Sequence, residues 1–169
     1  MINNRPFKIT LTINGEVKNI IFMYYRHIGN IPIFSCNDMG SYRLLEVGNN
    51  EKVIIIGSDL LSKLNDIDIE ILAWILILRY DTGLNRSDYK LEDAMYIDSI
   101  ISNIYGISAL TDTLRHILEL IKLDKKQTKL IKYRINYLEN EFLNNFSYKN
   151  IDVNNILKRV NLAQVLEVE

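Results

Sequence analysis

The stretch of sequence that decides the fold runs from Ile67 to Leu78 and reads IDIEILAWILIL. Asp66 can act as the N-cap of a helix that continues to about Tyr80. A helix that is apolar on nearly every side has to be surrounded by protein, so we expect it at the centre of the fold, between a sheet and later helices. The side chains predicted to form that centre are Leu72, Trp74, Ile75, Leu76 and Leu78.

The same stretch argues against a membrane span. Asp68 and Glu70 interrupt it and Arg79 follows it. It is therefore well short of the roughly 20 apolar residues that a span needs. We expect a buried core helix and no membrane association.

Upstream of this helix, the chain carries the patterns of strands. Phe7 to Ile13 alternates apolar with polar residues, Asn14-Gly15 follows, and the return strand is expected at about Val17 to Tyr25. Asn-Gly tolerates the positive φ that a type I′ turn needs at both central positions, which predicts a β-hairpin.

Three further strands are predicted before residue 58. Ile31 to Cys36 is short, and its Pro32 favours the start of a strand or the edge of a sheet. Tyr42 to Val47 is expected to pair with Lys52 to Ile56. These hairpins predict an antiparallel sheet.

Helical periods and capping residues mark the rest of the chain, and Gly106 is expected to separate two helices. The other predicted helices run from Ser58 or Asp59 to Leu64, from Ser87 or Asp88 to about Tyr105, from Ser108 to Leu120 or beyond, from about Lys125 to Phe146, and from Val153 to Leu166. The predicted fold class is α+β, with an N-terminal antiparallel sheet packed against the buried apolar helix and a C-terminal helical bundle.

Length and composition indicate one intracellular domain. A chain of 169 residues with 48% hydrophobic residues can build one core. We expect a single domain over 1–169, mainly β over 1–57 and helical over 58–120, with a helical extension over 121–169. The net charge of −1 names no partner. Cys36 is the only cysteine and the N-terminus carries no apolar signal segment, so a reducing, cytoplasmic compartment is expected.

Four pieces of sequence between Ile31 and Leu120 form a series. They are VIIIGSDLL at 53–61, LNDIDIEILA at 64–73, DSIISNIYG at 98–106 and ISALTDTL at 107–114. In this order they resemble parts of small M48-type zinc metallopeptidases: the edge strand and following helix, the approach to the zinc helix, the downstream aspartate segment, and the helix after its glycine. Compact members of that family are found in bacterial and phage genomes. The resemblance implies a metallopeptidase-like helical core over 58–120.

The residues that would bind zinc in this family are missing. The His-Glu-x-x-His motif places two histidines one helical turn apart on the metal, and its glutamate polarises the bound water. The corresponding positions here are Trp74, Ile75 and Leu78, the third ligand falls on Ala94, and only Asp98 is left of the metal-site neighbourhood. The resemblance therefore implies a pseudoenzyme without a metal or other cofactor.

Three other residues that could carry chemistry have simpler interpretations. His27 and His116 lie in different regions and neither completes a ligand set, although Glu119 follows His116 by one turn. Cys36 is expected to be a small buried hydrophobe.

A group of carboxylates invites two interpretations. Glu92, Asp93 and Asp98 lie within about two helical turns and could serve acid–base chemistry or bind a cation. The simpler interpretation is an acidic first turn that suits the helix dipole, next to a solvated face.

One basic cluster lies in the C-terminal third, with Tyr133 and Tyr137 nearby as groups that could stack on bases. Its members are Lys122, Lys125, Lys126, Lys129, Lys132 and Arg134. A solvated helix face is the default interpretation, and a phosphate-binding stripe is the alternative.

Two functional hypotheses of different classes follow. The first is a catalytically inactive metallopeptidase-like protein that acts as a protein-binding, structural or assembly component, for example of a phage. Its partner, another protein or a second copy, would bind through the helices after Leu120. The alternative is a nucleic-acid-associated accessory protein that uses the Lys122 to Arg134 stripe. An enzyme that works through Glu92, Asp93 or Asp98 would need a polar pocket, which the sequence does not indicate.

Overall fold

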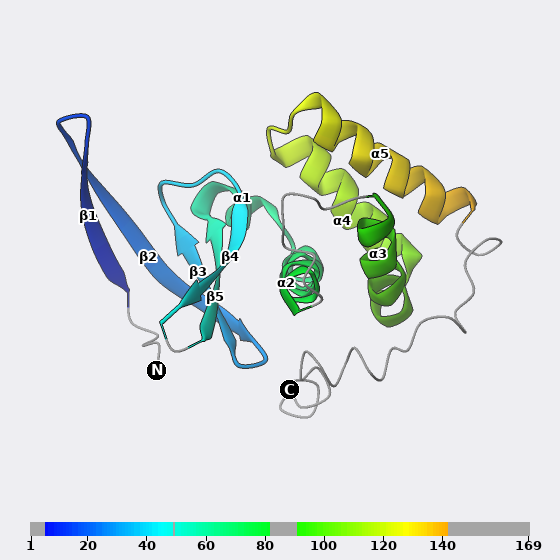
Figure 1. The fold of residues 1–169 in the computed structure, drawn as a ribbon, viewed down its shortest axis with the longest axis horizontal. Coiled ribbons are helices and arrows are strands. Elements are labelled where there is room, and N and C mark those ends of the chain that lie inside the picture. Colours follow the sequence, from blue (N-terminus) through cyan, green and yellow to red (C-terminus); the bar gives the residue numbers. More distant parts are fainter. Residues whose placement is uncertain (1–5, 49, 82–90, 142–169) are drawn as a thin grey trace. The chain divides into compact units, whose positions relative to one another are not determined.

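The computed structural model describes residues 6–48, 50–81 and 91–141 of the chain (Figure 1). These residues form an α+β fold in the predicted order, with the strands first and the helices after them. They divide into two compact units, and the boundary lies between Lys63 and Leu64. Whether the two units associate into the single domain expected over 1–169 is not tested by their separate structures, so the single domain stays a prediction.

The first unit is built on a five-stranded sheet with the strand order β1-β2-β3-β5-β4. Its strands are β1 (Phe7–Ile13), β2 (Glu16–Ile28), β3 (Ile31–Cys36), β4 (Tyr42–Val47) and β5 (Glu51–Gly57). The predicted antiparallel hairpins β1–β2 and β4–β5 are present. The sheet as a whole is mixed, because β5 inserts between β3 and β4 and runs parallel to β3.

The hairpin between β1 and β2 turns at Asn14-Gly15, as predicted. Both residues have positive φ, 52° and 80°, as a type I′ turn requires. β2 continues beyond the predicted end at Tyr25 to Ile28, because it also pairs with β3 after a change of register between Tyr24 and Arg26.

Pro32 lies in β3, which has β2 on one side and β5 on the other, a place where proline is unusual. Pro32 pairs with His27 of β2, but the ladder with β5 begins only at Ile33. Pro32 therefore precedes the part of β3 that is paired on both sides. Its predicted place near a strand start is confirmed.

An apolar cluster covers part of this sheet. Phe34 and Cys36 of β3 are buried in it together with Val53 and Ile55 of β5. The side chains packed against these four are Ile20, Phe22, Tyr24, Met39 and Leu45. Cys36 is thus a small buried hydrophobe, as predicted.

Five helices follow the strands in the described part of the chain. α1 (Ser58–Lys63) belongs to the first unit and packs against β3 and β5. The second unit contains α2 (Asp66–Asp81), α3 (Leu91–Tyr105), α4 (Ile107–Leu120) and α5 (Lys125–Asn140). In this unit α2 packs on α3 and α4, and α5 packs on α4 and α3.

α2 is the helix predicted to be apolar on all sides. Its residues from Ile71 to Leu78 are all buried, which confirms the five predicted core side chains, Trp74 among them. The predicted position of α2 next to the sheet concerns the two units together and stays a prediction.

Three predicted N-caps are wrong. Ser58 or Asp59 is the expected cap of the first helix, but both lie inside α1. Asn65, not Asp66, caps α2: Asn65 Oδ1 accepts the Asp68 backbone N–H at 2.8 Å, and Asp68 Oδ2 accepts the Asn65 backbone N–H at 3.2 Å. This reciprocal arrangement is a capping box. α4 starts after Gly106, whose φ of 94° suits glycine, so Ser108 lies inside the first turn.

The observed end of α5 differs from the predicted one. α5 ends at Asn140 with Glu141 as its C-cap, earlier than the predicted Phe146. The caps proposed at Ser87 or Asp88 and the helix predicted over Val153 to Leu166 lie outside the described residues. No helix among the described residues is long and apolar enough to cross a membrane.

Candidate functional site

The positions that resemble the zinc site of M48-type metallopeptidases hold buried apolar side chains. Trp74, Ile75 and Leu78 on α2 are 4%, 6% and 1% exposed, and Ala94 on α3 is 0% exposed. Zinc in proteins is bound by thiolate, imidazole or carboxylate groups. None of these four side chains offers such a group, so these four positions supply no zinc ligand.

Asp98, the polar residue of that neighbourhood, forms a buried ion pair. Its two carboxylate oxygens accept hydrogen bonds from Arg134 Nε at 2.7 Å and from Arg134 Nη2 at 2.6 Å. The two side chains are only 2% and 8% exposed. This bidentate pair joins α3 to α5. Arg134 therefore does not lie on the exposed basic stripe to which the sequence pattern assigned it, because its guanidinium faces the interior.

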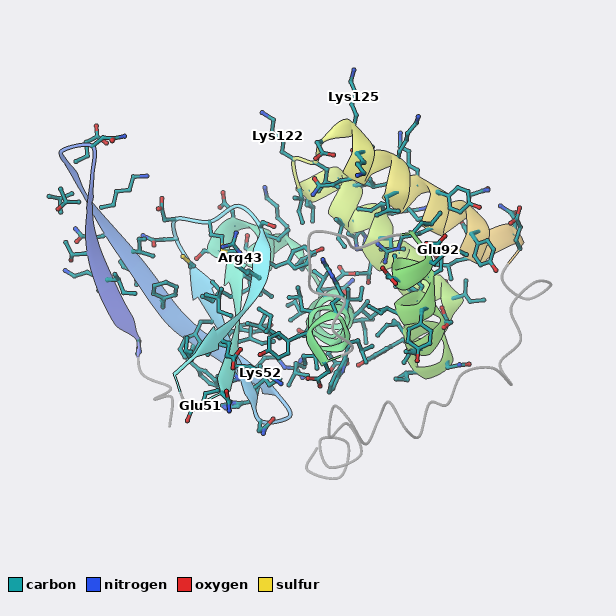
Figure 2. The ribbon with its side chains drawn as sticks, in the orientation of Figure 1. Arg43, Glu51, Lys52, Glu92, Lys122 and Lys125 are labelled. Atoms are coloured by element: carbon teal, nitrogen blue, oxygen red, sulfur yellow. The ribbon has the colours of Figure 1, made fainter. Side chains whose placement is uncertain are left out.

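The three carboxylates of α3 are separated by burial. Glu92 is exposed in the first turn (Figure 2). Asp93, in the same turn, is partly exposed, and negative charge there suits the helix dipole. Asp98 is buried against Arg134. Within the part of the chain that the structure describes, no group of three or more His, Cys, Asp or Glu side chains could hold a metal ion.

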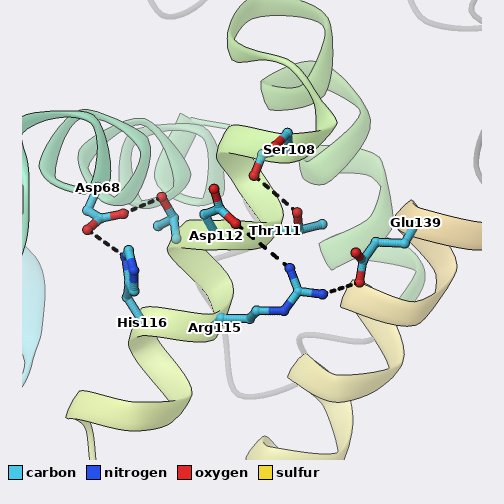
Figure 3. Close-up of polar contacts among 8 residues, drawn as sticks. Asp68, Ser108, Thr111, Asp112, Arg115, His116 and Glu139 are labelled. Carbon is cyan, nitrogen blue, oxygen red and sulfur yellow. Dashed lines mark hydrogen bonds and ion pairs between the residues drawn. The ribbon is translucent and has the colours of Figure 1, made fainter.

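A second buried carboxylate, Asp68, is a residue that the sequence pattern did not single out as a site. Its Oδ1 accepts a hydrogen bond from Thr113 Oγ1 at 2.7 Å, and its Oδ2 lies 2.8 Å from His116 Nδ1 (Figure 3). These contacts fasten the start of α2 to α4. His116 is thus engaged with Asp68, whereas the sequence had offered Glu119 as its neighbour. The sequence signal that could have identified this contact is Asp68 itself, a carboxylate inside an apolar run. A carboxylate buried in such a run needs hydrogen-bond partners.

α5 is part of the core of the helical unit. Its inner face buries Ile131, Ile135 and Leu138 in addition to Arg134. At the surface, Arg115 of α4 donates a hydrogen bond to Glu139 of α5 (Figure 3). Only the outward face of α5 is therefore available for a partner.

His27 has a partner within its own strand. Its Nδ1 shares a hydrogen bond with the Tyr24 hydroxyl, and the two rings lie 5.1 Å apart between centroids. Tyr24 in turn packs edge-on against Phe34. His27 therefore supports the apolar cluster of the sheet.

The remaining basic residues gather at the start of α5. We call them the lysine face: Lys122, Lys125, Lys126, Lys129 and Lys132. All five are exposed, and Figure 2 shows Lys122 and Lys125 projecting away from the helices where α4 passes into α5. A surface hollow of about 630 Å³ is lined by Leu123 and Thr128 together with four of these lysines, Lys125, Lys126, Lys129 and Lys132.

The charge of the lysine face is not neutralised by carboxylates among the described residues. None of the five lysines forms an ion pair with a carboxylate among residues 6–48, 50–81 and 91–141. Further along α5, burial raises the pKa of the Tyr137 phenol, and Glu141 and Tyr133 act in the same direction. A tyrosine phenol is neutral at physiological pH even without this shift, so Tyr137 adds no negative charge to the helix.

Comparisons of the chain with protein-family models, with curated proteins and with solved structures found no match. The resemblance to M48-type metallopeptidases therefore rests on the four pieces of sequence and stays a prediction.

Proposed function

We propose that this protein is a catalytically inactive, metallopeptidase-like protein that works by binding, as a protein-binding, structural or assembly component. The observation that carries the proposal is the filling of the ligand positions: Trp74, Ile75, Leu78 and Ala94 are all buried and apolar. The two buried carboxylates of the helical unit support it as well. Asp98 is paired with Arg134, and Asp68 with Thr113 and His116, so both serve to join helices.

A protein partner is supported by exposed apolar side chains on β2. Val17, Ile21 and Met23 lie on one face of this strand, with the polar Asn19 between Val17 and Ile21, and are 65%, 42% and 53% exposed. Alternate residues of a strand point to the same face, so the three form an apolar row. Such rows on a protein surface are typical of interaction sites.

Affinity capture with the full chain tests this proposal. The variant I21K/M23K should lose a specific protein that the wild type captures, because two charges interrupt the row. V47K, which places a lysine at an exposed apolar position of β4, is the matched control and should keep the partner. Hydrolysis of casein by the purified protein in zinc-containing buffer, lost on adding a chelator, would contradict the proposal.

Nucleic-acid binding is the second candidate function. The observation that favours it is the lysine face, with five exposed cations that have no carboxylate partner in the described parts of the chain. Protein and nucleic-acid partners would use different units, since the apolar row lies in the first unit and the lysine face in the second.

A further inference from the structure

The outward face of α5 has two chemically different halves. Residues three and four apart on a helix share a face, and the face opposite the buried residues begins with lysines and continues with neutral polar groups. In chain order these exposed residues are Lys125, Lys126, Lys129, Lys132, Tyr133, Asn136 and Asn140, and the exposed Glu139, which pairs with Arg115 of α4, lies at the edge of this face. Tyr133 is 49% exposed, one helical turn beyond Lys129. The Asn140 amide donates to Asn136 Oδ1 at 2.8 Å, so these two side chains form a pair.

Two of the five lysines, Lys125 and Lys126, lie in the first turn of α5, where positive charge is unfavourable. The N-terminus of a helix carries a partial positive charge, which repels cations there. α5 has no acidic residue in its first turn, while Lys125 and Lys126 are its first two residues. The nearest carboxylate in sequence, Asp124, accepts the Gln127 backbone N–H at 2.7 Å as part of the capping box. Lys125 and Lys126 weaken the start of the helix, and none of the five cations has a carboxylate partner in the described parts of the chain, so the lysine face is suited to an anion.

We propose that the outward face of α5 binds single-stranded nucleic acid, with the lysine face on the phosphates and Tyr133 stacked on a base. The proposal rests on the second candidate function and deepens it. An aromatic ring next to a row of cations is the combination that single-strand binders use. In a duplex the flat faces of the bases are stacked on each other, so an exposed tyrosine on a convex helix has no base to stack on. A purely acidic protein would need the lysines but would gain little from Tyr133, Asn136 and Asn140.

The number of lysines that contact phosphates determines the expected salt dependence of binding. Five phosphate contacts to a single strand predict a slope of log K against log salt of about −3.5, which is about a hundredfold loss of affinity between 50 and 200 mM salt. Loss of two contacts should make the slope less steep by about 1.4. Tyr133 carries no charge in this role, so its removal should weaken binding without changing the slope.

Fluorescence anisotropy with the full chain and a labelled 20-nucleotide oligothymidine tests this. The wild type should bind with the slope given above, and K125E/K129E should weaken binding at least tenfold at 50 mM salt. K8E/K63E removes the same charge from exposed lysines of the first unit and should have less than a threefold effect. Y133A should weaken binding about tenfold with an unchanged slope, and Y133F should bind as the wild type does.

The controls separate loss of binding from loss of folding. Because K125E/K129E removes repulsion at the start of α5, its midpoint of urea unfolding should be equal to or higher than that of the wild type. Equal weakening by K8E/K63E, tighter binding of a 20-base-pair duplex, or no binding of oligothymidine at 50 mM salt would each overturn the proposal. Stronger competition by polyglutamate than by unlabelled oligothymidine would also overturn it and point to an acidic protein, while the proposed non-catalytic role would stand.

Discussion

The ion pair of Asp98 and Arg134 gives the strongest quantitative prediction for the helical unit. D98L and R134M each remove one partner of the bidentate contact and leave the other charge buried, since the Asp98 and Arg134 side chains are only 2% and 8% exposed. Breaking a buried pair from one side costs about 3–5 kcal/mol, whereas replacing both partners with apolar groups is often close to neutral. D98L/R134M should therefore be more stable than either single variant.

Urea unfolding followed by the fluorescence of Trp74, the only tryptophan and a residue of α2, measures this. With a slope of about 2 kcal/mol per molar urea, each single variant should shift the midpoint down by about 2 M. The matched control is R115M, which breaks an exposed pair between α4 and α5 and should change stability by no more than about 1 kcal/mol. If the double variant loses as much as the sum of the two singles, the pair is not coupled and the reasoning fails.

Three further predictions concern packing. W74A should destabilise the protein by about 3–5 kcal/mol, measured by urea unfolding followed by circular dichroism, and emission typical of a water-exposed indole in the wild type would contradict its burial. G57A should lower the melting temperature, because a Cβ there would lie 1.9 Å from the Met39 carbonyl oxygen, whereas G40A, with nothing within 4 Å, should have little effect; equal effects would refute this. A quadruple variant that introduces the zinc ligands of M48-type metallopeptidases should lose its fold before it gains zinc, because each unpaired polar group placed in the core costs about 1–3 kcal/mol. Its substitutions are W74H, I75E, L78H and A94E, and a folded, zinc-loaded product would instead support a lost zinc site.

Local patterns predicted much of the fold because local physics decides it. Asn14-Gly15 specifies its turn through the backbone conformation that these two residues tolerate, and the bounds of β3 and β4 agree with the predicted ones. The apolar run of α2 predicted a buried helix because no other environment suits it. The displaced cap at Asn65 shows the limit of such patterns, since Asn65 and the predicted Asp66 are both good capping residues by type.

The contacts that escaped prediction join residues far apart in the chain. β3 and β5 run parallel with a whole strand between them in sequence. Asp98 is 36 residues from Arg134, and Asp68 is 48 from His116. Periodicity does not tell which buried carboxylate meets which cation, so Arg134 was grouped with the neighbouring lysines. The lysine face itself could be predicted from spacing, but its lack of carboxylate partners depends on how the helices pack.

The zinc content of the purified full-length protein tests the central claim most directly. The protein should be produced in zinc-supplemented medium, dialysed without chelator and analysed by mass spectrometry of its metal content against its protein concentration. Because Trp74, Ile75, Leu78 and Ala94, at the positions that resemble the zinc site, are buried and apolar, we predict far less than one zinc per chain, and unchanged thermal stability on adding a chelator. One zinc per chain, lost together with stability on chelation, would contradict the account.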